Sequence, residues 1–309
     1  MSVGLAVEVI FGVSLFCPPV SLHRRHWCLV SVVQQASLYG LTGMFPVDET
    51  HAIMVGESVA GVFVSLSRLL TKGIFDTDRN ADLLGLRVSI YVYFAISLGV
   101  IFVCWALFET TRKLSYCAHY VAKASLAQKQ EVSSGSSWRG LIRRLLRPIA
   151  GVMLAFFGTY TLYPGVITSP SSQVLGDWYA VLLVANCCLF DFLGRIVSGW
   201  HGWLSYEASP KFARVMAASM ARFLLIPLIV MCAAPKQSPL IQSEAVLFIL
   251  TAILTCSGGY LGSTPMMLGP ELVGHDEKEL AGNILAFCLL LSISVGTTVA
   301  FLFGYLISL

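Results

Sequence analysis

Residues 178–200, WYAVLLVANCCLFDFLGRIVSGW, decide the fold class of this chain. A helix rises 1.5 Å per residue, so an apolar stretch of about 20 residues is long enough to cross about 30 Å of hydrocarbon. This stretch also holds an acid and a base, Asp191 and Arg195, which are costly in such surroundings. It therefore predicts a membrane-spanning helix that keeps a charged pair.

The composition extends this interpretation to the whole chain. Of the 309 residues, 56% are apolar and 12% are charged, whereas about 25% are charged in an ordinary soluble domain. The mean hydropathy is +0.77, so too few polar side chains are available to cover a globule of this size. Barrel-like segments of about ten residues with alternating polarity are absent from the sequence. We therefore expect an all-α, polytopic bundle in lipid, because helices satisfy their own backbone there.

Nine apolar runs are long enough to span the bilayer. The first contains Glu8 and ends in Cys17-Pro18-Pro19, so a signal peptide is a competing interpretation. No Lys or Arg precedes it, and Arg24 and Arg25 follow it instead, which favours a span. The runs cover about 2–21, 27–46, 52–74, 86–108, 148–168, 178–200, 212–234, 245–268 and 280–308.

A basic segment divides these runs. Residues 109–147 are rich in Lys and Arg around a Ser- and Gly-rich centre at 131–137. The positive-inside rule predicts that this segment is cytoplasmic and that the C-terminus is outside. The loop with Lys211 and Arg214 agrees, whereas the one with Arg24 and Arg25 does not. We expect four helices in 1–108, a basic cytoplasmic loop in 109–147 and a five-helix bundle in 148–309.

Three polar residues are the candidates for binding a solute. Asp191 and Arg195 are four residues apart and share a helical face. Each costs roughly 2.5–3.5 kcal/mol at the centre of a membrane helix, so a helix that keeps both is a candidate for a functional site. The alternative is an ion pair that only locks helices together. Gln35 can donate and accept hydrogen bonds, which suits the edge of a nucleobase. Bonding to a neighbouring helix is its alternative. Glu57 is protonatable if it faces a cavity, but we expect it near the cytoplasmic end, in water.

A second group of residues is predicted to serve packing or conformational change. Gly56 and Gly61, with Ala60, allow close approach of another helix. Arg222 and Pro227 place a charge and a helix-distorting residue inside one run. Gly258-Gly259-Tyr260-Leu261-Gly262 and then Pro265 predict a broken helix, with a simple kink as the alternative. The residues that we expect to serve packing or conformational change are therefore Gly56, Gly61, Arg222, Pro227 and Gly259.

The sequence contains none of the common short signatures of catalysis or of metal binding. It lacks G-x-S-x-G, H-E-x-x-H, a P-loop and G-x-G-x-x-G. The nine cysteines include no C-x-x-C and are typical of packing residues, and the six histidines form no i,i+4 pair. We therefore expect no enzyme, no cofactor and no metal. The expected partners are a lipid bilayer and a small solute, and no nucleic acid.

Several segments, in order along the chain, resemble the equilibrative nucleoside transporter family. Phe190 to Arg195 resembles its F-[ND]-x-x-D-x-L-G-R signature, with Asp191 and Arg195 in matching positions. The other segments are Gln35-Ala36-Ser37-Leu38-Tyr39-Gly40 with Gly43 and Pro46, Ala60-Gly61, Tyr163-Pro164, Ala221-Arg222 with Pro227, Gly259-Tyr260-Leu261, and Gly269-Pro270 followed by the charged stretch 271–279 and Ala281-Gly282-Asn283-Ile284-Leu285-Ala286-Phe287.

The resemblance implies facilitated, sodium-independent movement of nucleosides or nucleobases by a major-facilitator-like bundle, in the plasma membrane. The family has eleven helices, and the first run here stands where its third would be, so helices one and two are expected to be absent. Ser58 is a departure, because the family commonly has glycine there. Asp191 and Arg195 would meet ribose hydroxyls, Gln35 would face the base, and Phe190 or Tyr39 would stack on it.

Two alternatives remain open at this point. The first is a proton-coupled transporter of nucleosides or other small polar solutes, with Glu57 or Asp191 taking the proton. The second is a truncated membrane protein that does not transport and only binds or assembles with partners. The sequence indicates no particular oligomeric state.

Overall fold

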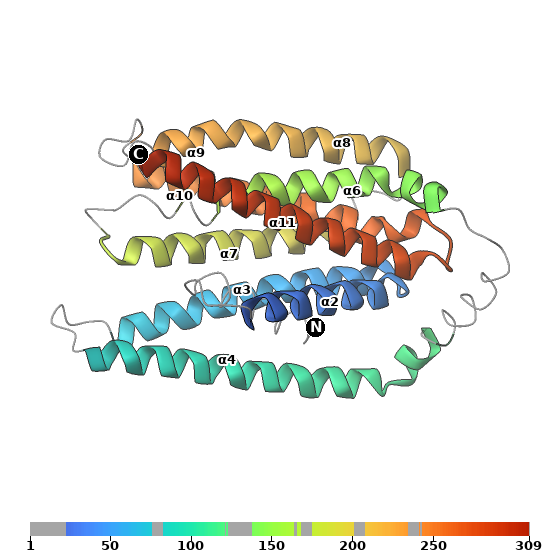
Figure 1. Ribbon diagram of the computed structural model, residues 1–309, viewed down its shortest axis with the longest axis horizontal. Coiled ribbons are helices and arrows are strands. Elements are labelled where there is room, and N and C mark those ends of the chain that lie inside the picture. The colour runs from blue at the N-terminus through green and yellow to red at the C-terminus, as the bar shows by residue number, and fades with distance from the viewer. Residues whose placement is uncertain are drawn as a thin grey trace.

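The computed structural model describes residues 23–75, 83–120, 122, 138–163, 166–167, 175–200, 208–233, 241 and 243–308, whose regular elements are all helical. The helices run side by side along the long axis of the molecule (Figure 1). They are α2 (His23–Gly43), α3 (Val47–Phe75), α4 (Leu83–Arg112), α6 (Trp138–Tyr160), α7 (Trp178–Ser198), α8 (Ala208–Ala221), η1 (Arg222–Leu224), α9 (Leu225–Ala233), α10 (Glu244–Leu268), η2 (Pro270–Leu272) and α11 (Lys278–Ser308).

Six segments of the described chain are long and apolar enough to cross a membrane. Two further helices, α2 and α6, coincide with the expected runs 27–46 and 148–168 without reaching that apolarity, and the expected run 2–21 lies outside the described residues. The count of nine spans is therefore only partly supported. The six segments are Val47–Ile74, Phe94–Thr111, Trp178–Ser198, Arg214–Cys232, Glu244–Leu272 and Lys278–Phe303.

Helix α6 begins earlier than the hydropathy of the sequence predicts. It starts at Trp138, so the end of the expected loop 109–147 is helical, and Pro148 lies inside the helix. Leu141 and Leu145 are buried on one face of this early part. Arg and Leu are good helix formers, and an apolar stripe that finds a partner stabilises a helix in spite of basic residues on its other faces.

Two proline- or glycine-rich places behave differently from each other. The path from α8 to α9 is interrupted by the 3₁₀ turn η1 just before Pro227, because proline lacks a donor for the carbonyl four residues earlier and crowds it. In contrast, α10 runs unbroken through Gly258, Gly259 and Pro265. The broken helix expected there is wrong: packing partners close to these glycines hold the helix together.

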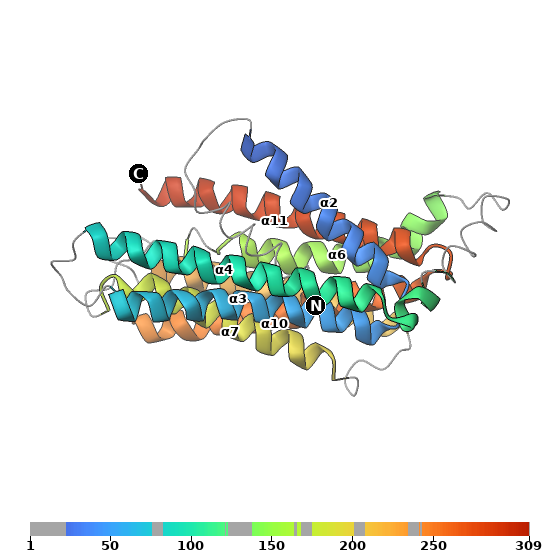
Figure 2. The same ribbon diagram turned by 90° about the horizontal axis from the view of Figure 1, so that it is seen from below.

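The helices before and after the basic segment pack directly on each other. Helix α3 packs on α7 and α2 packs on α11, while α6 lies between α10 and α11; Figure 2 shows α2 crossing α11. A shared core cluster joins the two groups and includes Tyr39, Met54, Phe156 and Leu285. Helix α4 lies at the edge beside α3 (Figure 1) and exposes Tyr91, Leu98, Phe102 and Trp105. Such a face suits lipid.

Candidate functional site

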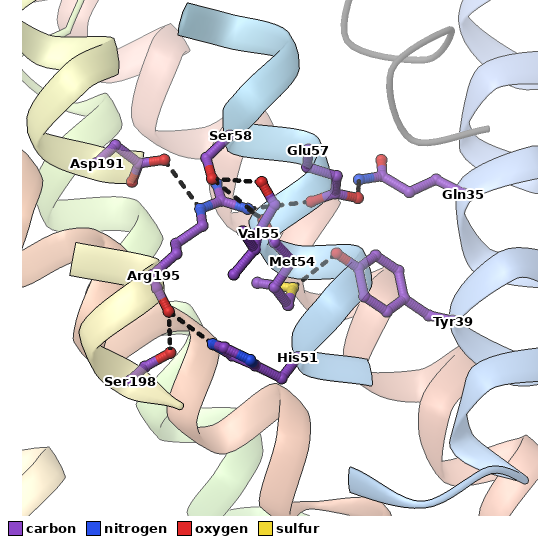
Figure 3. Close-up of polar contacts among 10 residues, drawn as sticks. All are labelled: Gln35, Tyr39, His51, Met54, Val55, Glu57, Ser58, Asp191, Arg195 and Ser198. Atoms are coloured by element: carbon purple, nitrogen blue, oxygen red, sulfur yellow. Dashed lines mark hydrogen bonds and ion pairs between the residues drawn. The ribbon is translucent and has the colours of Figure 1, made fainter. Parts of the chain in front are cut away.

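A buried arginine on α7 is the centre of the polar contacts between α3 and α7. Arg195 is 5% exposed. Its Nε donates to Asp191 Oδ2 at 2.9 Å, and its Nη1 donates to Glu57 Oε2 and to the carbonyl oxygen of Met54, both at 3.1 Å (Figure 3). The guanidinium therefore bridges two carboxylates with charge-assisted bonds, which are about twice as strong as neutral ones.

Gln35 extends this network from α2. Its Nε2 donates to Glu57 Oε1 at 3.3 Å, so Glu57 bonds Gln35 through one oxygen and Arg195 through the other (Figure 3). Gln35 is 7% exposed and Glu57 is 3% exposed. The structure thus brings all three candidate binding residues, Gln35, Asp191 and Arg195, into one connected network. We name Gln35, Glu57, Asp191 and Arg195 the α2–α3–α7 cluster.

Glu57 differs in one respect from the sequence prediction. The expectation that it is hydrated is wrong, because Glu57 is 3% exposed and lies opposite Arg195 in the interior, whereas its position near the cytoplasmic end stays a prediction. A buried carboxylate needs such a partner, because an unpaired charge in a low dielectric costs several kcal/mol. The only sequence signal was an acid inside an apolar run, and the run alone does not indicate which base on another helix would meet it.

Asp191 is the most accessible charged group of the cluster. Its side chain is 29% exposed, against 6% for Arg195 and 4% for Glu57. The i,i+4 spacing on α7 lets it reach Arg195 along the helix. Its Oδ2 accepts a hydrogen bond from Arg195 Nε. An accessible carboxylate next to a buried guanidinium can offer an acceptor to a hydroxyl-bearing solute.

Gly259 on α10 lies directly behind this pair. A Cβ atom at Gly259 would collide with the backbone oxygen of Asp191 and lie 3.0 Å from its Oδ1 and 3.1 Å from the backbone nitrogen of Arg195. One turn along α7, a Cβ at Gly194 would collide with the backbone oxygen of Cys256. These two glycines allow α7 and α10 to approach closely and hold the charged pair at the front of α7.

A second contact between α3 and α7 holds the end of α7. His51 Nε2 donates to the carbonyl oxygen of Arg195 at 2.8 Å, and Ser198 Oγ donates to the same oxygen at 2.7 Å (Figure 3). A side chain at Gly199 would collide with the His51 ring. Carbonyl groups at a helix C-terminus lack partners in their own helix, so His51 links α3 to a group that requires a donor.

The two aromatic candidates for stacking on a base, Tyr39 and Phe190, differ in burial. Tyr39 on α2 is 2% exposed, and its hydroxyl donates to Met54 Sδ at 2.7 Å. Its ring belongs to the core cluster that joins α2, α3, α6 and α11, so Tyr39 is a packing residue in this conformation. Phe190 is half-buried on α7, next to Asp191.

The remaining residues of interest on α3 are small. Gly56 is buried and Gly61 is half-buried. Ser58 is 3% exposed, and its Oγ donates to the carbonyl oxygen of Val55 at 2.8 Å. This serine therefore satisfies its hydroxyl within its own helix, where a buried hydroxyl would otherwise be costly.

Arg222 forms a separate polar cluster in the helices after the basic segment. It is 6% exposed, and its Nε donates to Ser257 Oγ at 2.9 Å. Its Nη1 donates to the carbonyl oxygen of Ala155 at 3.0 Å, and its Nη2 donates to Thr159 Oγ1 at 2.7 Å and to the carbonyl oxygen of Leu254 at 2.8 Å. The side chain thus fastens η1 to α6 and α10 at the point where α8 and α9 are interrupted.

Comparison with known proteins confirms the family resemblance. The family model described as "Nucleoside transporter" matches residues 28–141 and 137–305. Equilibrative nucleoside transporter 4 from Homo sapiens is 29% identical over 332 residues, which cover 87% of this chain and 61% of the relative. For equilibrative nucleotide transporter 1 from Arabidopsis thaliana the identity is 28% over 284 residues, covering 88% and 60%. For equilibrative nucleoside transporter 1 from Mus musculus it is 26% over 317 residues, covering 89% and 66%.

The chain spans 60% to 66% of the length of these three relatives. The family model, in contrast, covers most of the chain. Six described segments are long and apolar enough to cross a membrane. The chain is therefore a multi-pass membrane protein that belongs to the nucleoside transporter family.

Proposed function

We propose that this chain moves nucleosides or nucleobases across a membrane by facilitated, alternating-access transport. The observation that carries the proposal is the α2–α3–α7 cluster: a buried guanidinium, two carboxylates and an amide bonded together inside an apolar bundle. Residues of this kind are expensive in a membrane protein and are a mark of solute pathways. Nucleosides supply hydroxyls on the sugar and both donors and acceptors on the base, which suit these groups.

Each polar residue has a role in the proposed binding. The partly exposed Asp191 accepts a hydrogen bond from a ribose hydroxyl, and Arg195 donates to the same sugar. Gln35 faces the base, where its amide offers a donor and an acceptor. Binding in this way requires Gln35 to exchange its bond with Glu57, and Arg195 to share its bonds with the solute.

The same bonds support a mechanism of alternating access. Glu57 and Gln35 precede the basic segment, whereas Asp191 and Arg195 follow it. We propose that the helices of 1–108 rock against those of 148–309 in a nine-span, major-facilitator-like arrangement, opening the α3–α7 and α2–α11 contacts in turn. A solute that bonds Arg195 more strongly in one arrangement than in the other shifts the equilibrium between the two, because only differential binding moves populations.

The orientation follows from the basic residues. The end of α4 and the beginnings of α6 and α8 lie at one end of the bundle (Figure 1), where Lys113, Arg139, Arg143 and Arg214 are exposed. The positive-inside rule places this end in the cytoplasm. We propose the plasma membrane as the location, which immunofluorescence on non-permeabilised cells with an epitope inserted between α6 and α7 would test.

Uptake by cells that lack their own nucleoside transport tests the function. We expect the chain to support uptake of uridine, adenosine or hypoxanthine, and Asp191→Asn to reduce it by about tenfold or more at unchanged surface expression, since a charge-assisted bond is worth roughly 1.5–3 kcal/mol. Asp276→Asn, an exposed position before α11, is the matched control. Correct insertion without uptake of any of the three solutes would refute transport.

A proton-coupled transporter is the second candidate, and the charge of the cluster favours it. Glu57 and Asp191 carry two negative charges and Arg195 carries one positive charge, so one proton would neutralise the cluster. In that case uptake rises as the external pH falls, and Glu57→Gln removes the pH dependence. Proteoliposomes with an internal pH dye separate the candidates, because facilitated transport moves solute without acidifying the lumen.

A further inference from the structure

The beginning of α6 carries a buried stripe and an exposed basic stripe. We name residues 138–147 the α6 N-terminal segment. Leu141 and Leu145 are 3% and 0% exposed and pack against Val273 and Ala281. Arg139 and Arg143, four residues apart, are both exposed. The segment is thus folded against the bundle on one face and presents arginines on another.

An exposed apolar stripe lies beside the arginines. Trp138, Ile142 and Leu146 recur every four residues and are 60%, 42% and 54% exposed. Each is one residue away from an arginine, so the two stripes are about 100° apart around the helix and lie on adjacent faces. A helix that presents a large apolar stripe next to a basic one, rich in Arg and with Trp at its edge, is typical of the membrane–water interface.

The position of the segment in the bundle agrees with an interface. Arg144 donates to Glu277, the residue just before α11, at 2.9 Å, which ties the segment to the end of the bundle. Beyond it, α6 enters the apolar body of the molecule at the buried Pro148. The segment begins at the end of the bundle where α4 ends and α8 begins (Figure 1). Its exposed stripes therefore meet the surroundings at the edge of the transmembrane region.

We propose that the α6 N-terminal segment binds anionic phospholipid headgroups. Arg139 and Arg143 contact the phosphate and carboxylate groups, and Trp138, Ile142 and Leu146 enter the boundary between headgroups and acyl chains. Charge alone would suit any anion, but the apolar stripe beside it requires a ligand with an apolar part in the same place. This inference does not depend on the transported solute.

Brominated lipids test the proposal, because bromine quenches tryptophan fluorescence only at short range. The purified full chain is reconstituted in phosphatidylcholine nanodiscs that contain a small fraction of brominated phosphatidylserine or of brominated phosphatidylcholine. The chain has six tryptophans, so the difference from the Trp138→Phe variant isolates the signal of Trp138. We expect Trp138 to be quenched more strongly by the anionic lipid.

Removing the arginines should remove this preference. Each basic residue near an anionic surface contributes about 1 kcal/mol of attraction. The preference for anionic lipid should therefore fall roughly fivefold when one arginine is replaced, and roughly twenty- to thirtyfold in the double variant Arg139→Gln with Arg143→Gln. Arg139→Lys with Arg143→Lys should keep most of it. Lys113→Gln with Arg214→Gln is the matched control, because it removes the same charge from exposed positions at the same end of the bundle.

Four results would overturn the proposal. They are an unchanged preference in the double Gln variant, an equal loss in the matched control, loss of the preference when inorganic phosphate is added at constant ionic strength, and no preference in the unmodified chain. The third would assign the arginines to free phosphate, and the fourth would point to an acidic protein instead. Thermal melting of each variant verifies folding, which exposed substitutions should leave unchanged.

Discussion

Two arginines, Arg195 and Arg222, are almost equally buried but are bound by different kinds of partner. Arg195 is held by two carboxylates, one from α7 and one from α3, whereas Arg222 is held by two hydroxyls and two backbone carbonyls of α6 and α10. The partners of Arg195 lie on both sides of the basic segment, and those of Arg222 lie on one side. Arg195 can exchange its charged partners for a solute when the helices before and after the basic segment move. Arg222 is bound by neutral groups within one group of helices, so it holds those helices together.

The largest effect is expected at Arg195. Arg195→Gln leaves Glu57 as a buried charge without its guanidinium, which costs about 3–5 kcal/mol of stability, and it removes a proposed sugar donor. The melting temperature in detergent and the uptake by cells should both fall. Combining it with Glu57→Gln should recover most of the stability and none of the uptake. Recovery of uptake in the double variant would show that the pair only locks helices together.

Arg222 should affect stability more than solute affinity. Arg222→Gln leaves several buried acceptors with fewer donors, at about 1–3 kcal/mol for the unsatisfied groups. The melting temperature should fall while the KM for uptake changes little, because the hydrogen bonds of Arg222 go to α6 and α10 and only its charge acts on Asp191 of the α2–α3–α7 cluster. A changed KM at unchanged stability would contradict the fastening role.

The glycines behind the two arginines sharpen the comparison. A Cβ at Gly259 meets the backbone of Asp191, which cannot move without shifting α7, whereas a Cβ at Gly258 meets Arg222 Nη2 and Thr159 Oγ1, which are side-chain atoms. Gly259→Ala should therefore cost about 1–3 kcal/mol through forced separation of helices, and Gly258→Ala should cost less. The melting temperatures of the two variants, each compared with that of the unmodified chain, test this order. Equal losses in melting temperature would mean that the backbone contact between α7 and α10 adjusts to an added Cβ atom as easily as the Arg222 side chain does.

The smallest effect is expected at Gln35. Gln35→Leu removes one amide donor from the Glu57 carboxylate. At 3.3 Å this hydrogen bond is long, so we expect its loss to cost about 1.5 kcal/mol, the low end for a bond to a charged group. If Gln35 faces the base, the KM should rise for adenosine and hypoxanthine by different factors, because their edges differ in donors and acceptors. A uniform change for all solutes, including uridine, would assign Gln35 to interhelical bonding instead. Initial uptake rates over a range of concentrations of each solute give the KM values.

Local patterns predicted much of the fold and part of the site. The spacing of Asp191 and Arg195 placed them on one helical face, and the structure pairs them at 2.9 Å. Helix α6 shows the limit of hydropathy, because its first ten residues include four arginines and are nevertheless helical. Their stability comes from Leu141 and Leu145 packing on Val273 and Ala281 and from Arg144 bonding Glu277, far away in sequence. The unbroken α10 shows the same limit, since the groups that pack on its glycines belong to other helices.

The sequence by itself determined that the chain lies in a lipid bilayer and that it is helical there, because apolar runs of bilayer length allow only helices that satisfy their own backbone. It also determined that Asp191 and Arg195 meet, since one helical turn joins them. Only the tertiary structure decided that Glu57 faces Arg195 and that Gln35 bonds Glu57. Those contacts depend on how α2, α3 and α7 pack, and packing is decided by side chains and close-approach glycines on several helices at once.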